Sequence, residues 1–302
     1  MKAYTQHYIN GQWVNATSNQ TLAVTDSNTE EVIATVPQGT ASEAEQAVLA
    51  ARAAFASWSA LSVEERAGYL DKVAAGLKAR AEELTATIAR EVGMPLKMAG
   101  MVQVGMPVFN WGNFAKVARN FAFETEIKHS LIVREPIGVV GCITPWNFPL
   151  NQIALKVAPA MVAGCTVVLK PSEIAPLNAM ILAEVIHEAG VPAGVFNLVN
   201  GLGPEVGEVL ASHAEVDMVS FTGSTRAGKR VGELASQSIK RVALELGGKS
   251  ASVVLDDADF AAAIKGSIGA CLLNSGQTCS AHTRLLVPES RYEEAKALAQ
   301  GV

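Results

Sequence analysis

The sequence predicts an α/β fold centred on a doubly wound parallel sheet. From Gly138 onward, short apolar segments rich in β-branched residues alternate with stretches of helical periodicity. Strands that are apolar on both faces and separated by helices are typical of a parallel sheet covered by helices on each side. Five segments fit this description: GVVGCIT, TVVLK, VFNLV, MVSFT and RVALEL. In such a sheet ligands bind beyond the carboxyl ends of the strands, as in dinucleotide-binding domains.

Length and composition exclude several classes of protein. The chain has 302 residues, more than one typical domain, so two or more structural units are expected. Hydrophobic residues make up 49% and charged residues 18%, a globular composition that argues against disorder. The net charge is -5 and no run of lysine and arginine stands out, which argues against nucleic acid or an anionic membrane as the main partner.

Targeting and metal-binding signals are absent from the sequence. The start, Met1–Asn10, lacks the apolar core of a secretory signal, and the most apolar stretch, Ile153–Leu169, is broken by Lys156, Pro159 and Gly164. We therefore expect a cytoplasmic protein with no membrane span. The four cysteines form no CxxC pair, so neither a metal site nor a disulfide scaffold is predicted.

Two helices are predicted in the amino-terminal part. The pairs Ser42 with Glu45 and Ser62 with Glu65 each fit a capping box, in which hydroxyl and carboxylate satisfy free N–H groups at a helix start. The second helix is expected to end near Gly93.

Residues 121–137 predict a different structure, two extended segments joined by a turn near Lys128 and His129. An amphipathic hairpin of this kind either pairs with another subunit or folds onto its own domain, and the pattern does not choose between the two. After Gly248 the sequence predicts a strand, a helix, the loop Asn274–Ser280, a strand and a last helix. This is too little material for an independent core of ordinary size.

Two glycine-rich turns are candidate nucleotide-binding loops. Gly201 and Gly203 follow the strand VFNLV, but Val206 occupies the third position of the pattern GxGxxG, so an ordinary strand-to-helix turn is an equally good interpretation. The turn Phe221–Gly228 opens a helix whose free N–H groups and dipole attract a pyrophosphate, and Ser224 adds a hydroxyl donor.

Polar residues also follow two other strands. Lys170 and Glu173 lie where the ribose of a nucleotide would bind, and the carboxylate would accept ribose hydroxyls and repel a 2′-phosphate; a surface ion pair is the alternative. Trp146 and Asn147 lie between prolines, which either hold the amide toward one place or simply stiffen a turn.

One cysteine and one glutamate are candidates for chemistry. Cys279 lies in the polar loop NSGQTCS, where a thiolate can react, whereas Cys142 and Cys165 lie in apolar sheet segments and are expected to be inert. Glu245 lies within an apolar strand, where desolvation would raise its pKa toward that of a general base; alternatively it faces solvent at a strand end.

Five motifs taken together resemble the aldehyde dehydrogenase superfamily. They are TPWNFP at Thr144–Pro149, LKPSE at Leu169–Glu173, FTGST at Phe221–Thr225, LELGGK at Leu244–Lys249 and GQTC at Gly276–Cys279. Each motif alone is weak. The five occur in the family's order and at its usual separations, so together they are specific.

This resemblance implies a reaction, the oxidation of an aldehyde to a carboxylic acid with hydride transfer to NAD(P)+. Cys279 would be the nucleophile, Asn147 would donate its amide to the oxyanion, and Glu245 would activate the water that hydrolyses the thioester. Relatives that transfer the acyl group to coenzyme A generally lack a glutamate at the position of Glu245, so hydrolysis is expected.

The resemblance also assigns cofactor-binding positions. These are Thr144, Trp146, Lys170, Ser172, Glu173, Gly203, Phe221, Gly223, Ser224 and Leu246. Glu173 favours NAD, although NADP remains possible.

Domain roles follow from the same resemblance. Residues 1–120 and 138–246 would form the dinucleotide-binding domain, 121–137 an oligomerisation hairpin, and 247–302 the first part of the catalytic domain. Members of the superfamily continue well past Val302. The further residues would complete the catalytic domain and contribute a strand to a homodimer or homotetramer, so the 302-residue chain alone is expected to be inactive.

Two other functions remain as alternatives. The chain could be a non-catalytic NAD-binding module of the same fold, although a structural role would require none of Cys279, Glu245 and Asn147. A cysteine hydrolase without a redox step would leave the nucleotide-binding motifs unexplained.

Overall fold

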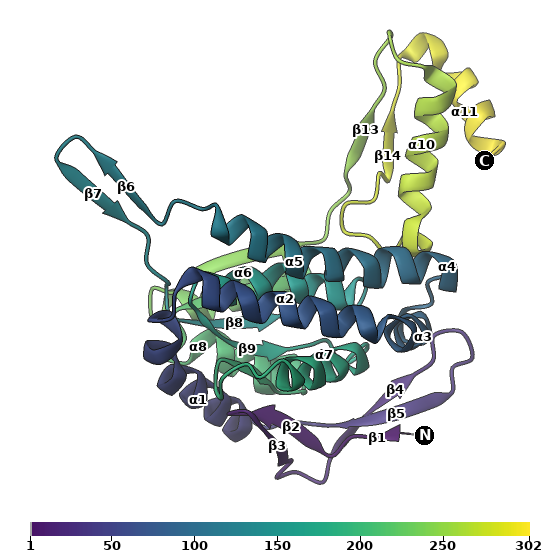
Figure 1. The fold of residues 1–302 in the computed structure, drawn as a ribbon. Coiled ribbons are helices and arrows are strands. Elements are labelled where there is room, and N and C mark those ends of the chain that lie inside the picture. The colour runs from purple at the N-terminus through teal and green to yellow at the C-terminus, as the bar shows by residue number, and fades with distance from the viewer. Residues whose placement is uncertain (1) are drawn as a thin grey trace. The chain divides into compact units, whose positions relative to one another are not determined.

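The computed structural model describes residues 2–302 as two compact units, one through Glu245 and the other from Leu246 to Val302 (Figure 1). The first unit is built on a seven-stranded sheet with the order β12-β11-β8-β9-β10-β2-β3. The five predicted strands are all present, as β8 (Val139–Ile143), β9 (Thr166–Lys170), β10 (Phe196–Leu198), β11 (Met218–Gly223) and β12 (Arg241–Leu246). The pairs β8–β9, β9–β10 and β8–β11 are parallel, which confirms the doubly wound parallel sheet.

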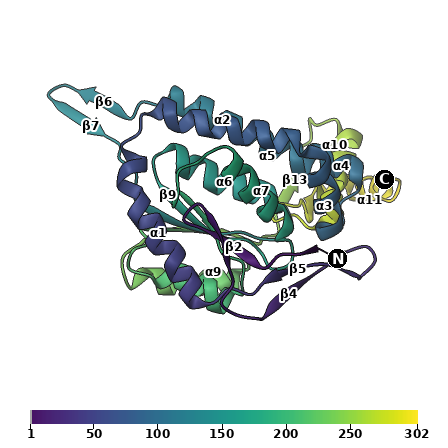
Figure 2. The same ribbon diagram turned by 60° about the horizontal axis from the view of Figure 1, so that its bottom comes forward.

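Helices cover both faces of this sheet, as the apolar strands require (Figure 2). On one face lie α6 (Pro149–Val162) and α7 (Leu177–Glu188), which are covered in turn by α2 (Val63–Ala79) and α5 (Met106–Arg119). On the other face lie α1 (Ala41–Ser59), α8 (Glu208–Ser212) and α9 (Thr225–Ser236). In the sheet, β9 and β10 lie on one side of β8, and β11 and β12 lie on the other. The loops after β8 and β11 therefore lie at the point where the strand order reverses.

The amino-terminal strands were not predicted. β2 (Gln6–Ile9) and β3 (Gln12–Asn15) form an antiparallel hairpin, and β2 extends the sheet by pairing antiparallel with β10. Asn10 and Gly11 both have positive φ, 52° and 73°, as a two-residue hairpin turn requires. The Asn-Gly pair is a strong local signal for such a hairpin. A separate sheet contains β1 (Lys2–Ala3), β5 (Val32–Pro37) and β4 (Thr21–Thr25).

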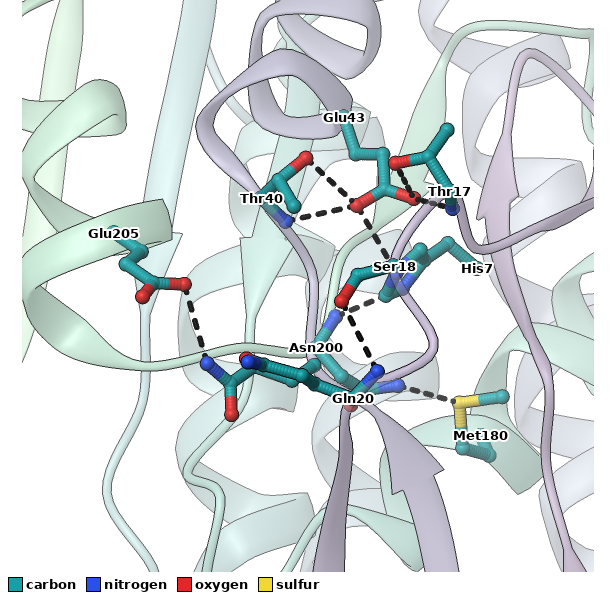
Figure 3. Close-up of polar contacts among 10 residues, drawn as sticks. His7, Thr17, Ser18, Gln20, Thr40, Glu43, Met180, Asn200 and Glu205 are labelled. Carbon is teal, nitrogen blue, oxygen red and sulfur yellow. Dashed lines mark hydrogen bonds and ion pairs between the residues drawn. The ribbon is translucent and has the colours of Figure 1, made fainter.

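The predicted start of the first helix is wrong. The capping box at α1 joins Thr40 to Glu43, whose carboxylate accepts the Thr40 N–H at 2.8 Å, whereas Ser42 lies within the helix. Glu43 is only 1% exposed; its carboxylate also accepts the Thr17 N–H at 2.8 Å and lies 3.7 Å from His7 (Figure 3). These contacts join residues that are far apart in the sequence, so local spacing does not reveal them. They favour a helix start at Thr40 over one at Ser42.

The second predicted helix starts as expected but is interrupted. The Ser62–Glu65 capping box is confirmed at the start of α2. The helix stops at Arg80, and α3 (Ala81–Val92) then runs to Gly93, whose φ of 82° ends it as predicted. Arg80 lies 2.6 Å from Glu184 on α7, so a tertiary ion pair holds the break.

The predicted hairpin and its turn are confirmed. β6 (Glu124–Ile127) and β7 (Ser130–Val133) pair antiparallel with each other, and Lys128 in the turn has a φ of 56°. Leu131 and Val133 are 55% and 50% exposed, so the hairpin does not fold onto its own sheet. Several of its apolar side chains are therefore exposed.

The second unit contains the predicted elements in their predicted order. β13 (Ala251–Val253) and β14 (Arg284–Leu286) form a parallel pair beside α10 (Phe260–Leu272) and α11 (Tyr292–Gln300). Its core is small and consists of Val254, Phe260, Ile264 and Ala295 with partly buried neighbours. Within residues 2–302, no helix has the length and apolarity needed to cross a bilayer.

A buried carboxylate links α3 to α7. Glu91 is 3% exposed, and its carboxylate accepts the Leu177 N–H at 2.6 Å and the Asn178 side-chain amide at 2.9 Å. Burial raises the pKa of Glu91 from 4.5 to about 7, although these hydrogen bonds act in the opposite direction.

The raised pKa of Glu91 predicts how stability depends on pH. The folded state binds the proton more tightly than the unfolded state, so the free energy of unfolding should fall, by up to about 3 kcal/mol, as the pH rises from about 4.5 to about 7. Glu91→Gln should remove this part of the pH dependence. Urea unfolding followed by tryptophan fluorescence measures it, because all four tryptophans lie in the first unit. Equal pH dependence in the two proteins would contradict the prediction.

Candidate functional site

The loop after β8 contains three of the predicted site residues. The Thr144 N–H donates to the Lys170 carbonyl at 3.1 Å, which places this loop beside the end of β9. The Thr144 side chain is buried, and its hydroxyl oxygen has no hydrogen-bond partner within residues 2–302. Trp146 is 38% exposed and Asn147 is half-buried. The loop ends at Pro149, which starts α6 with the φ that a first helical turn needs.

The loop after β9 holds the predicted ion pair. Lys170 is 3% exposed, and its ammonium donates to the Pro171 carbonyl at 2.7 Å and to the Glu173 carboxylate at 3.2 Å. Burial lowers the pKa of Lys170, and Glu173 opposes this effect. The Glu173 side chain is 41% exposed, so its carboxylate can still accept hydrogen bonds from a ligand. Ser172 is buried, and its hydroxyl oxygen accepts the Ile174 N–H at 3.3 Å.

A pocket of about 250 Å³ lies between β11, α9 and the turn that starts at Gly203. Apolar side chains form most of its wall and two arginines lie at it; the lining residues are Ile143, Gly203, Pro204, Gly207, Glu208, Phe221, Arg226, Ala227, Arg230, Val231 and Leu234. The structure thus brings the predicted residues Gly203 and Phe221 together. A Cβ at Gly203 would meet no atom within 4 Å, so the backbone there is open to a ligand.

The residues that follow Phe221, between β11 and α9, support the pocket. A Cβ at Gly223 would lie 2.6 Å from the Phe221 ring, so only glycine leaves that ring in its place. Ser224 caps α9 by accepting the Ala227 N–H at 3.2 Å. Its hydroxyl hydrogen remains available to a ligand at the helix N-terminus.

Glu245 is exposed on β12, and this corrects the expectation that it is desolvated. The alternative interpretation, a carboxylate facing solvent, describes the structure. The physical reason is that β12 is the edge strand of the sheet, and its side chains are exposed or only half-buried. Leu246, at the end of this strand, is half-buried.

A buried lysine near Glu245 was not recognised from the sequence. Lys156 on α6 is 8% exposed, and its ammonium donates to the Ser220 hydroxyl at 3.0 Å. Burial lowers the pKa of Lys156, and the charge of Glu245 acts in the opposite direction. The available signal was a single cation inside an apolar helix, although a lysine there was interpreted only as a break in the apolar stretch.

Cys279 lies in the second unit, in the loop between α10 and β14, and its side chain is exposed. Asn274, Ser275 and Gly276 have consecutive φ values of 55°, 58° and 77°. Left-handed conformations are costly at non-glycine residues and are concentrated at functional sites. The Thr278 hydroxyl donates to the Leu273 carbonyl at 3.2 Å and helps to hold the turn.

The other cysteines differ from Cys279 in burial. Cys142 and Cys165 are both buried, and burial raises the pKa of both thiols, that of Cys142 to about 12. This agrees with the expectation that they are inert, because the thiolate is the reactive form. Cys271 is half-buried on α10.

The predicted residues are divided between the two units. The first unit contains the loops after β8, β9 and β11 together with Glu245, and the second contains Cys279. Among residues 2–302, no group of His, Cys, Asp and Glu has the arrangement of a metal site.

A family model and a curated relative both match this chain to aldehyde dehydrogenases. The model of the aldehyde dehydrogenase family matches residues 13–300. A 3-succinoylsemialdehyde-pyridine dehydrogenase from a Pseudomonas species is 48% identical over 99% of this chain and 63% of its own length.

Two solved structures match nearly all of this chain. Aldehyde dehydrogenase C from Pseudomonas syringae, a mutant solved with NAD+ and octanal, is 47% identical with a TM-score of 0.95 and covers 98% of this chain. An aldehyde dehydrogenase from Bartonella henselae is 44% identical with a TM-score of 0.96 and covers 100% of it. The chain spans 61% and 64% of these two proteins.

Proposed function

The chain belongs to the aldehyde dehydrogenase family, and we propose that the protein containing it oxidises an aldehyde to a carboxylic acid with NAD+ as hydride acceptor. The observation that carries this proposal is the exposure of Cys279, the one exposed thiol among residues 2–302, in a loop that begins with three left-handed residues, Asn274, Ser275 and Gly276. Such a thiol can form a thiolate and attack a carbonyl carbon.

The first unit has features that fit NAD. The apolar pocket beside Gly203 and Phe221 suits a nucleobase, and the N-terminus of α9 with Ser224 suits a pyrophosphate. Lys170 and Glu173 would bind ribose hydroxyls, and the unpaired Thr144 hydroxyl remains available as a polar contact. When bound, NAD+ would supply the hydride acceptor. In this proposal residues 1–120 and 138–246 form the dinucleotide-binding domain.

The chain's own residues supply the remaining chemistry. The Cys279 sulfur adds to the aldehyde carbon, and the side-chain amide of Asn147 donates to the oxyanion that forms. After the hydride has left, the acyl group is held on sulfur as a thioester. Glu245 takes a proton from the water that attacks this thioester, and the carboxylic acid and the thiol are released.

A direct test measures NADH formation by the complete protein that contains this chain. A panel of aliphatic, aromatic and semialdehyde substrates should give NADH and the matching acid without coenzyme A. If the folded protein binds NAD+ but oxidises none of them, the function is that of a nucleotide-binding module instead.

The exposed hairpin β6–β7 would pair with another subunit in a homodimer or homotetramer.

Glu173 is predicted to determine the preference for NAD+ over NADP+. Glu173→Gln replaces a carboxylate, which accepts hydrogen bonds from ribose hydroxyls and repels a 2′-phosphate, with a neutral amide. The value of kcat/KM with NAD+ should therefore fall about 10-fold to 100-fold. The ratio of kcat/KM for NADP+ to that for NAD+ should rise. Steady-state kinetics with each dinucleotide measure both changes. An unchanged ratio, or a parent that prefers NADP+, would contradict this role.

A further inference from the structure

The helix that follows Pro95 is not a regular α-helix. It starts as α4 (Leu96–Met98), continues as a π-helical segment, η1 (Ala99–Gly105), and becomes α-helical again in α5. Pro107 accounts for the widened turn. Its nitrogen cannot donate to the carbonyl of Gln103 four residues earlier, and its ring pushes that carbonyl away. Single π-turns inside α-helices are frequent at functional sites.

The π-turn places Gln103 beside the loop after β8. Gln103 is 0% exposed, and its side-chain Nε2 donates to the backbone carbonyl of Asn147 at 2.9 Å. The side-chain Oε1 is also buried and has no hydrogen-bond partner within residues 2–302. Among residues 2–302, the hydrogen bond that the Gln103 side chain makes therefore goes to Asn147.

We propose that Gln103 is a positioning residue for Asn147. A hydrogen bond to the Asn147 carbonyl fixes the peptide plane after Asn147 and therefore ψ of that residue. The direction of the Asn147 side-chain amide depends on this backbone, and an oxyanion donor must be aimed to within a fraction of an ångström. This inference rests on the proposed function, in which Asn147 donates to the oxyanion.

The structure offers a matched control for Gln103. Asn110 lies about two helical turns further along, on α5, and its side-chain amide donates to the Asn151 side chain on α6 at 2.8 Å. This bond leaves the same continuous helix but does not contact Asn147. Asn110→Leu removes an amide hydrogen bond of the same kind without touching the loop after β8.

The first test compares Gln103→Leu with Asn110→Leu in the complete protein that contains this chain. Gln103→Leu should lower kcat for aldehyde oxidation about 10-fold to 100-fold, because a misplacement of about 1 Å can cost a factor of that size. NAD+ affinity and the melting temperature should change little. Asn110→Leu should keep kcat within about 3-fold of the parent. A parent-like kcat in Gln103→Leu would overturn the proposal.

A double-mutant comparison asks whether Gln103 acts through Asn147. In an Asn147→Ala background the Gln103→Leu substitution should cause no further loss, since the donor that it positions is gone. Losses that multiply in the double variant would show that Gln103 acts elsewhere and would overturn the assignment.

The isosteric variant Gln103→Glu gives a second kinetic readout. The buried carboxyl can donate to the Asn147 carbonyl only when protonated, so the ratio of kcat in the variant to kcat in the parent should fall as the pH rises. A ratio independent of pH would contradict the role. This variant also decides the question if Gln103→Leu does not fold.

Crystal structures separate this inference from the proposed function. The Asn147 peptide should be rotated in Gln103→Leu and unchanged in Asn110→Leu, whether or not the parent oxidises aldehydes. A parent without activity would remove the proposed function, whereas an unrotated peptide in Gln103→Leu would remove the positioning role.

Discussion

Cys279→Ser is expected to lower aldehyde oxidation by about 10⁴-fold or more, the size of effect seen when a covalent nucleophile is removed. The substitution exchanges one atom, sulfur for oxygen. A thiolate is a much stronger nucleophile than a serine hydroxyl, which attacks a carbonyl carbon only with a strong base beside it. Steady-state NADH formation with the best aldehyde, measured in the complete protein, gives the ratio.

The control for this substitution lies in the same unit. Cys271→Ser makes the same exchange at a half-buried thiol on α10 and should leave turnover within about 3-fold of the parent. Both variants should bind NAD+ like the parent, because the candidate dinucleotide contacts lie almost entirely in the first unit. Substantial NADH formation by Cys279→Ser would show that another group attacks the aldehyde.

The parallel sheet could be predicted because its strands carry their signal locally. Each is a short apolar segment, and each is followed by a polar or glycine-rich loop, as at Lys170 and Gly223. Ligands of such sheets bind beyond the carboxyl ends of the strands, and the structure places Gly203 and Phe221 at one pocket. The assignment of these two residues to a cofactor came from the glycine-rich turns and the resemblance to the superfamily.

The features that could not be predicted depend on contacts between distant residues. The capping register of α1 is set by Glu43 with Thr17 and His7, and the break at Arg80 is held by an ion pair to α7. Gln103 and Asn147 are 44 residues apart in the chain. Local periodicity contains no information about such pairs, so the helix start at Thr40, the break at Arg80 and the contact between Gln103 and Asn147 were not predicted.

The exposure of Glu245 could not be predicted for a related reason. An apolar strand context indicates burial only if the strand is covered on its outer side, and β12 is the edge strand. The sequence identifies the residue and its motif. Its environment depends on which strand ends the sheet.

Glu245→Gln is expected to lower steady-state turnover by about 10²-fold to 10⁴-fold, the contribution typical of a general base. Glutamine keeps the shape of the side chain but cannot accept a proton from water. The loss should fall on hydrolysis of the thioester and not on its formation, because Cys279 and Asn147 are unchanged. Rapid mixing should therefore show a burst of about one NADH per active site followed by a slow phase.

The pattern of the burst distinguishes this role from a structural one. Glu82→Gln replaces another exposed glutamate, on α3. Its time course of NADH formation after rapid mixing should be the same as that of the parent. Without an effective base, an added small thiol or amine should accept the acyl group and speed the slow phase of Glu245→Gln, because it attacks the thioester without help from the carboxylate. If the burst itself disappears in Glu245→Gln, then Glu245 acts before or during thioester formation, and a different group must activate the water.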